Sequence, residues 1–199
     1  MITPFTLASL PVTPWKNGAG ETREIVSIPS ADAPFLWRAS IATLAQDGPF
    51  SLFPGVDRVI MLLGDAGLWL RGDDLHHHLE PGVPWAFPGE WRLATEGVSG
   101  PGMDFNVMTQ RSRASAQVTI ATTAQQPGAE GIAFVLKGGW QLAGNHFSAA
   151  SGIWWQGETP GAFMPHSEEA SLLLADIRRH NEIPARRKNE YHKPKCSRD

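Results

Sequence analysis

Residues 59–70 read V-I-M-L-L-G-D-A-G-L-W-L, which is an apolar strand, a turn with glycines and a second short strand. Residues 133–142 read A-F-V-L-K-G-G-W-Q-L and have the same pattern. The likeness continues downstream, where P-G-V-P-W-A-F at 81–87 corresponds to A-S-G-I-W-W at 150–155. A hairpin unit that occurs twice predicts a duplicated β-barrel, although chance similarity is an alternative for two loosely related copies.

The rest of the chain also favours short strands. Glycine and proline together make up 36 of the 199 residues, and they are spaced along the whole chain instead of forming one linker. This spacing is typical of many strands joined by turns, and no segment keeps a 3.6-residue apolar period over three turns. We therefore predict an all-β chain with two β-barrels, residues 1–110 and 111–177. The expected strands are 22–26, 37–44, 58–63, 67–70, 84–87, 104–108, 117–122, 132–136, 153–155 and 171–177.

Composition excludes several classes of protein. Hydrophobic residues make up 42% and charged residues 19%, and no apolar run approaches the roughly 18 residues of a membrane span. Residues 1–10 lack the basic segment and long apolar segment of a secretory signal, so we expect a cytoplasmic protein with no membrane partner. Cys196 is the single cysteine, which rules out a disulfide or a cysteine metal cluster within one chain.

The net charge of −3 hides two parts of opposite sign. Residues 178–199 carry eight Lys/Arg and three Asp/Glu, 8 − 3 = +5, which leaves 9 − 17 = −8 for residues 1–177. An acidic body argues against nucleic acid as a partner, because phosphate contacts need a cationic surface. Residues 178–199 contain few apolar residues to bury, so we expect a disordered basic tail. A solvated extension is favoured there over an arm that touches an anionic partner.

An unusual loop occurs at residues 14–24, P-W-K-N-G-A-G-E-T-R-E. Its glycines permit positive φ and a close approach of the backbone to a ligand. Backbone N–H groups and Lys16 could then meet an anion, with Trp15 as an apolar wall. The phosphate-loop pattern G-x-x-x-x-G-K-[ST] is absent. A tight turn into the strand at 22–26 explains the loop equally well.

A second loop, D-G-P-F-S-L-F-P-G-V-D-R at residues 47–58, holds two phenylalanines among turn-forming residues and could cover the mouth of a barrel. Arg58 stands at the start of an apolar run, where a guanidinium can hold a carboxylate through two hydrogen bonds. The residues alone slightly favour a surface salt bridge from Arg58 to Asp57 or Asp47.

Alternation places polar side chains on shared strand faces. Arg38 and Ser40 share one face of the strand at 37–41, and Asp104, Asn106 and Met108 share one face of the strand at 104–108. If these faces point inward, they line a ligand pocket. If they point outward, they form an ordinary solvated face, and alternation does not decide between the two.

The triplet His76-His77-His78 raises the question of a metal site, because His76 and His78 would share one strand face. Metal-binding cupins add a Glu and a third His at defined spacing, whereas here Glu80 is only two residues beyond His78. We therefore favour an exposed hairpin and expect no metal and no other cofactor. No nucleophile motif such as G-x-S-x-G is present.

Four segments, taken together and in order, resemble the HutD/Ves family: 14–24, W-R-A-S-I-A at 37–42, 47–58 and D-F-N-V-M at 104–108. The resemblance extends over about residues 4–177 and implies a bicupin that lacks the usual cupin metal residues. It also implies that in some bacteria the protein is encoded with histidine-degradation genes and senses an intermediate such as N-formylglutamate or urocanate. Members called Ves are associated with cold and other stresses, and E-T-R-E-I at 21–25 is closer to that branch.

The resemblance, together with the patterns above, defines a predicted ligand site. In it Lys16 and Arg58 neutralise a carboxylate, Asn106 and Asn17 fix its orientation, and aromatic side chains form the apolar wall. This predicts a non-catalytic protein that binds a small anionic metabolite in a regulatory or stress-related role, and a homodimer is compatible with it. The alternative is a metal-independent isomerase or lyase that uses Lys16 or Asp104 as acid or base. The predicted ligand-binding residues are Trp15, Lys16, Asn17, Arg23, Arg38, Phe53, Arg58, Asp104 and Asn106.

Overall fold

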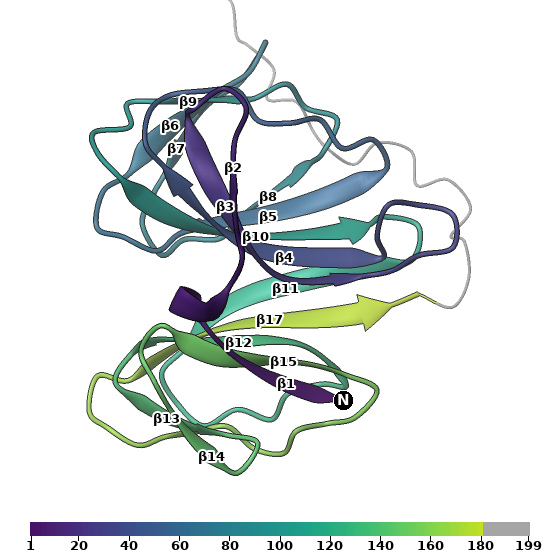
Figure 1. Ribbon diagram of the computed structural model, residues 1–199, viewed down its shortest axis with the longest axis vertical. Coiled ribbons are helices and arrows are strands. Elements are labelled where there is room, and N and C mark those ends of the chain that lie inside the picture. The colour runs from purple at the N-terminus through teal and green to yellow at the C-terminus, as the bar shows by residue number, and fades with distance from the viewer. Residues whose placement is uncertain (181–199) are drawn as a thin grey trace, which may run out of the picture.

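The computed structural model describes residues 1–180, which form an all-β chain with one short 3-10 helix at Leu7–Ser9. Two halves lie one above the other (Figure 1). The expected tail lies outside the described residues from position 181 on, while Arg178 and Arg179 end the last strand. None of the described helices is long and apolar enough to span a membrane.

The first half contains two antiparallel sheets. The larger has six strands in the order β2-β3-β4-β10-β5-β8, and the smaller has the order β7-β6-β9. The bounds of these strands are β2 Val12–Pro14, β3 Gly20–Ile28, β4 Trp37–Leu44, β5 Val56–Leu62, β6 Leu68–Arg71, β7 His76–Leu79, β8 Trp85–Pro88, β9 Ala94–Glu96 and β10 Gly102–Gln110.

The second half repeats this plan with a five-stranded sheet, β1-β15-β12-β17-β11, and a three-stranded sheet, β14-β13-β16. The order β4-β10-β5-β8 corresponds strand by strand to β11-β17-β12-β15, and β7-β6-β9 corresponds to β14-β13-β16. The similar segments 59–70 and 133–142 are thus equivalent hairpins, β5-β6 and β12-β13. The bounds are β1 Ile2–Thr6, β11 Ala114–Ala121, β12 Glu130–Lys137, β13 Gly139–Leu142, β14 Asn145–Ser148, β15 Ser151–Gln156, β16 Met164–Pro165 and β17 Ser171–Arg179.

One strand departs from the expected division at residue 110. β1 pairs with β15, from Ile2 opposite Trp155 to Thr6 opposite Ser151, so the N-terminal strand belongs to the sheet of the second half. It covers the edge of β15, which would otherwise carry unpaired backbone groups. Phe5 of β1 also stacks on Phe134 of β12, with ring centroids 6.0 Å apart.

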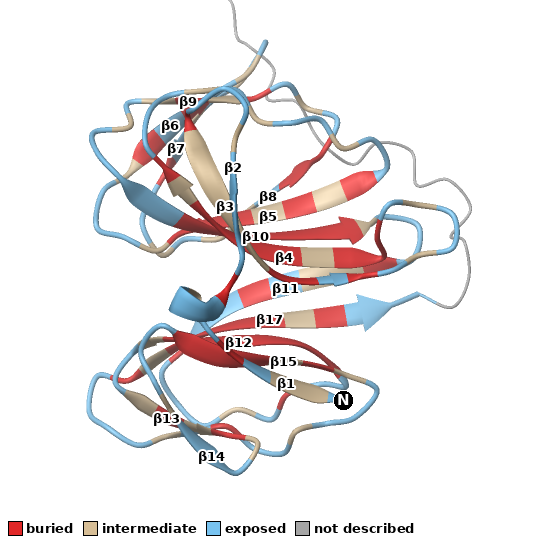
Figure 2. Ribbon diagram, in the orientation of Figure 1, coloured by how far each residue is buried: buried red, intermediate tan, exposed pale blue. Residues whose placement is uncertain are grey.

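The two large sheets pack face to face through an apolar cluster that draws on both halves (Figure 2). Trp37, Ala39 and Ile41 of β4 turn one face of the strand toward this cluster, and Phe105 and Val107 of β10 do the same. Because strand side chains alternate, the polar residues of β4 and β10 must face the interior of the first half. Of the two orientations that the sequence left open for these polar faces, the fold adopts the inward one.

A buried ionic group also joins the halves. Glu130 of β12 is only 6% exposed. Its Oε1 accepts a hydrogen bond from Nε1 of Trp37 at 2.6 Å, and its carboxylate accepts two from Arg179, each of 2.7 Å. The buried charge is therefore paired, as such charges must be in a low-dielectric interior.

Candidate functional site

A cavity of about 470 Å³ opens on the inner face of the six-stranded sheet. Eight of the nine predicted ligand-binding residues line it, and Arg23 does not. The lining residues are Thr13, Pro14, Trp15, Lys16, Asn17, Thr22, Arg38, Ser40, Ala42, Pro49, Phe50, Ser51, Phe53, Arg58, Asp104, Asn106 and Met108. Loops far apart in the sequence thus meet the polar faces of β4, β5 and β10.

Arg58 is the most unusual group in this cavity, because its side chain is an almost fully buried cation that is 6% exposed. Its guanidinium lies over the rings of Phe50, Phe53 and Phe87, at 5.2, 5.3 and 5.0 Å from their centroids. Such contacts stabilise a desolvated cation, yet burial still lowers the pKa of Arg58 to about 10. The expected surface salt bridge to Asp57 or Asp47 does not form, since Asp57 pairs with Arg111 and Asp47 accepts from backbone N–H groups.

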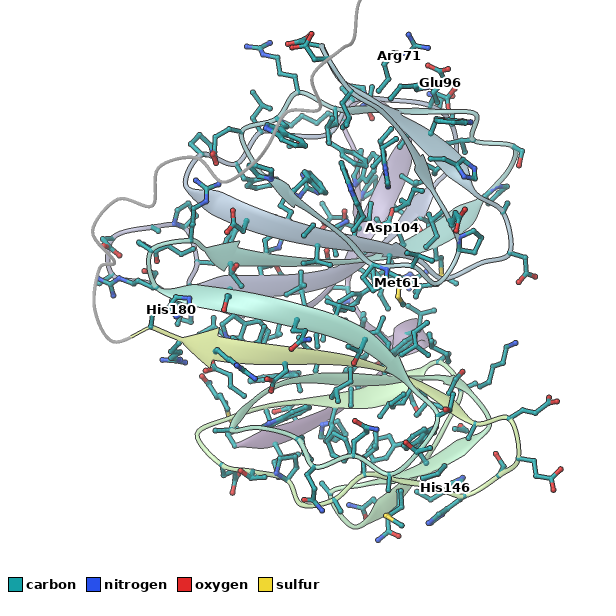
Figure 3. The ribbon with its side chains drawn as sticks, turned by 180° about the vertical axis from the view of Figure 1, so that it is seen from behind. Met61, Arg71, Glu96, Asp104, His146 and His180 are labelled. Carbon is teal, nitrogen blue, oxygen red and sulfur yellow. The ribbon has the colours of Figure 1, made fainter. Side chains whose placement is uncertain are left out.

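A line of hydrogen bonds connects Arg58 to Asp104. Nη2 of Arg58 donates to Oδ1 of Asn106 at 3.0 Å, and Nδ2 of Asn106 donates to Oδ1 of Asp104 at 3.0 Å. Asp104 is fully buried, and desolvation raises the pKa of its carboxyl to about 6 although Asn106 and Arg58 favour the ionised form. In Figure 3, Asp104 lies farther from the second half than Met61, which faces the junction.

Two buried polar atoms of this line remain without a hydrogen-bond partner among residues 1–180: Nε of Arg58 and Oδ2 of Asp104. One is a donor and the other is an acceptor. Buried polar groups are nearly always paired, and leaving one unpaired costs about 1–3 kcal/mol. Because both residues line the cavity, the site offers a ligand one cationic donor and one anionic acceptor.

The glycine loop forms one wall of the cavity and is also a tight turn into β3. The backbone N–H of Trp15 donates to the carbonyl of Gly20 at 2.9 Å, and the indole Nε1 of Trp15 donates to Oγ1 of Thr22 at 2.7 Å. Oδ1 of Asn17 accepts from the backbone N–H of Ala19 at 2.9 Å. The amide oxygen of Asn17 therefore holds the loop, and Lys16 beside it is exposed at the rim.

The cavity lining is cationic as a whole, with Lys16, Arg38 and Arg58 against Asp104. Arg38 is partly neutralised, because its Nε lies 2.8 Å from Oε1 of Glu24. Arg58 has no comparable carboxylate within 4.0 Å among the described ion pairs. The site therefore suits an anion.

Arg23 points away from this cavity for a simple reason. Thr22 lines the cavity, and the next residue of a strand faces the other side. Arg23 instead reaches the carbonyl of Leu7 at 3.4 Å and Oε1 of Glu21 at 3.8 Å. The alternation rule that was applied to β4 and β10 would have separated Arg23 from the site if it had also been applied to β3.

Several lining residues were not in the predicted site. Ser40 and Met108 share strand faces with Arg38 and Asn106, so alternation signals them. Phe50 contacts Arg58 from a loop that was already suspected of covering the cavity. Nothing in the sequence pattern distinguishes Thr13 or Ser51 from other loop residues.

The histidine triplet lies on β7 and is occupied with aromatic contacts. His76 and His78 flank Trp69, with ring centroids at 4.2 and 4.8 Å, and His77 stacks on Trp85 from the other face at 4.4 Å. Burial, followed by the charge of His78, lowers the pKa of His77. Within residues 1–180 no group of three or more His, Cys, Asp or Glu side chains is placed to hold a metal ion.

Comparison with known proteins shows the family to which the chain belongs. The HutD family model matches residues 8–174. Protein Ves of Cronobacter sakazakii is 44% identical over 179 residues, which are 87% of this chain and 97% of that protein. The structure of HutD from Pseudomonas fluorescens superposes with a TM-score of 0.79 at 25% identity and covers 90% of this chain and 100% of that one.

A more distant match shows the fold alone. A cupin 2 conserved barrel domain protein from Leptotrichia buccalis superposes with a TM-score of 0.58 at 9% identity, over 88% of this chain and 96% of that one. The strand arrangement is accordingly cupin-like. From the extent of the family match and the identity to Ves, the chain belongs to the HutD family.

Proposed function

We propose that this protein is a bicupin that binds a small carboxylate in the cavity of its first half, without turning it over, in a regulatory or stress-related role. The observation that carries the proposal is Nε of Arg58, a buried donor without a protein partner within residues 1–180 that belongs to a cavity-lining cation. A guanidinium and a carboxylate form the strongest common polar pair in a desolvated site. The cationic lining favours an anion further.

The ring of phenylalanines supports the same proposal. Phe50, Phe53 and Phe87 exclude water from Arg58, and electrostatic attraction is stronger where water is excluded. The equivalent strands of the second half contain Val135 and Leu174, both buried in an apolar cluster. The binding role is therefore assigned to the first half, with the second half as its structural partner.

Candidate ligands follow from the family. HutD members are encoded with histidine-degradation genes in some bacteria, so N-formylglutamate, urocanate and histidine are the first compounds to test. One matched HutD structure is described with a formate condition, which makes formate a useful minimal carboxylate. We expect calorimetric binding of at least one of these four compounds to the wild-type protein.

The matched variants for this experiment are Arg58→Lys and Arg92→Lys. Both keep a positive charge, but only the first removes a cavity-lining guanidinium, because Arg92 is exposed and outside the cavity. Arg58→Lys is expected to weaken binding by about tenfold or more, since a lysine cannot reproduce the planar donor geometry. Absence of heat from all four compounds at millimolar concentration would contradict the proposal.

A second function is favoured by one observation. The pKa of Asp104, raised to about 6 by burial, suits a group that takes up and releases protons near neutral pH. A metal-independent isomerase or lyase would use this carboxylate as acid or base. The test is to incubate bound ligand in deuterated water and follow its C–H signals by NMR. Exchange that disappears in Asp104→Asn would favour the enzyme, whereas a ligand that stays unchanged favours binding alone.

A further inference from the structure

The line Arg58, Asn106, Asp104 has a direction that the chemistry of its members imposes. A guanidinium can only donate hydrogen bonds, so Asn106 must present its oxygen to Nη2 of Arg58. The amide nitrogen of Asn106 is then turned to Asp104 and donates to its Oδ1. The line therefore ends on a carboxylate oxygen, Oδ2 of Asp104, which can only accept while the group is ionised.

This terminal oxygen has no partner in the sheet that surrounds it. Asp104 is fully buried, and Oδ2 has no partner in the part of the chain that the structure describes. The cross-strand neighbours of Asp104 are Ala42 of β4 and Leu62 of β5, whose side chains offer no donor. The remaining side is the cavity that Asp104 lines. The cavity is therefore the side from which we expect a donor to reach Oδ2.

We infer that Asp104 selects, among small carboxylates, those that also carry an N–H or O–H group, by accepting a hydrogen bond from that group while Arg58 holds the carboxylate. The inference rests on the proposed function and narrows its ligand to N-acyl amino acids, hydroxy acids and similar donor-bearing acids. A ligand without the donor leaves this buried oxygen unpaired. Sites built to pair with a substrate N–H or O–H reject analogues that lack it.

The test uses two probes that differ in one group. N-acetylglycine carries an amide N–H, and acetoxyacetate replaces that N–H by an ester oxygen. Each is titrated into the wild-type protein at pH 7.5, and dissociation constants are read from ¹H–¹⁵N chemical shifts, which resolve millimolar binding and report on Nε–H of Arg58 directly. We expect N-acetylglycine to bind about tenfold or more tightly, because a hydrogen bond to a charged group is lost with the ester.

Asp104→Asn makes a sharper prediction, because Asn106 fixes the orientation of the new amide. Its oxygen must take the place of Oδ1 to accept from Asn106, so its NH₂ takes the place of Oδ2. The cavity then presents a donor, and the preference should reverse in favour of acetoxyacetate. Asp65→Asn removes an exposed carboxylate outside the cavity and should keep the wild-type preference.

The outcomes separate the two proposals. If both probes bind the wild-type protein with equal affinity, the role of Asp104 is overturned while carboxylate binding stands. If neither probe nor formate shifts any signal, both proposals fall. The wild-type comparison decides the matter even if Asp104→Asn does not fold.

Discussion

Asp104 and Arg58 are ionisable side chains in a largely apolar setting. Burial disfavours the charged form of each, which raises the pKa of Asp104 to about 6 and lowers that of Arg58 to about 10. Groups that are hydrated in the unfolded chain and desolvated in the folded one reduce the free energy of unfolding. Keeping both charged groups in the interior therefore lowers the stability of the fold while it provides the polar groups of the cavity.

The stability of Asp104→Asn should depend on pH in a defined direction. The carboxyl has a pKa of 3.8 in its reference state and about 6 in the folded protein, so the folded state binds the proton more tightly. Stability of the wild-type protein therefore rises as pH falls from about 7 toward 4, and the ionised carboxylate lowers it by about 3 kcal/mol above that range. We expect Asp104→Asn to be more stable than wild type at pH 8, by about 1–3 kcal/mol, with the difference shrinking toward pH 5.

Urea denaturation at pH 8, 7, 6 and 5 measures this difference. Arg58 on β5 is the charged group that acts on Asp104, and it stays protonated throughout, so it adds no slope of its own. Asp65→Asn serves as the control, because Asp65 is exposed and its variant should parallel wild type. If the difference in the free energy of unfolding between Asp104→Asn and wild type stays constant from pH 8 to 5, the raised pKa of Asp104 is refuted.

At the level of single residues, the sequence named eight of the seventeen residues that line the cavity, but it could not show whether the polar strand faces point inward or outward. Asp104 and Asn106 were paired by alternation alone, and only the packing of Phe105 and Val107 against the second half turns them inward. Arg23 was included in the predicted site because it belongs to the motif at 14–24, although its position on β3 directs its side chain away from the cavity. The three phenylalanines around Arg58 come together only when the loop at 47–58 folds over β5 and β8 brings Phe87 beside it. The local sequence does not predict this long-range contact.

Among the elements, the hairpin formed by β2 and β3 holds the cavity wall in place. Gly20 begins β3, and a Cβ added there would lie 2.3 Å from the carbonyl oxygen of Thr43 and 3.2 Å from the ring of Trp15. The glycine therefore allows β3 to approach β4 while Trp15 lies across the turn. This close approach explains a glycine at this position in steric terms.

Gly20→Ala should both destabilise the protein and disturb the cavity. The backbone oxygen of Thr43 is not free to move without changing the β3-β4 pairing, so we expect a loss of about 1–3 kcal/mol and a changed environment for the Trp15 indole. Gly64→Ala is the matched control, because a Cβ there meets nothing within 4 Å. Thermal unfolding and the indole N–H chemical shift measure the two effects. Equal melting temperatures for the two variants would show that β3 can shift to accommodate the added Cβ without loss of stability.

Strand prediction succeeded where amphipathic alternation or a repeat marked the segment. β4 begins and ends where expected, at Trp37 and Leu44. β1, by contrast, was missed, because Ile2–Thr6 is short, contains Pro4 and is stabilised by pairing with residues about 150 positions later. Local sequence cannot reveal a partner at that distance.

At the scale of the whole molecule, the two halves should unfold as one unit. The cluster between the large sheets contains residues from both halves, and Trp37 of the first half donates to the buried carboxylate of Glu130 in the second. We expect Trp37→Phe to lower the free energy of unfolding by about 2–4 kcal/mol, because it removes both a charge-assisted hydrogen bond and buried volume. The loss should appear in a single transition.

Far-UV circular dichroism and tryptophan fluorescence, recorded on the same denaturation series, test this cooperativity. Trp69→Phe is the control, since Trp69 is 40% exposed and its change should stay within about 0.5 kcal/mol. Two separated transitions in wild type or in Trp37→Phe would show that the halves are independent. Coincident transitions that shift together would support one folding unit.

The pairing of β1 with β15 bears on how the protein is made. Thr6 lies opposite Ser151, so 151 − 6 = 145 residues must be added before the strand meets its partner, which takes roughly 7–30 s at typical rates of synthesis. During that time the strands of the first half can already pair with one another, whereas β1 has no neighbour. The first of the described strands to be synthesised is therefore among the last to be paired.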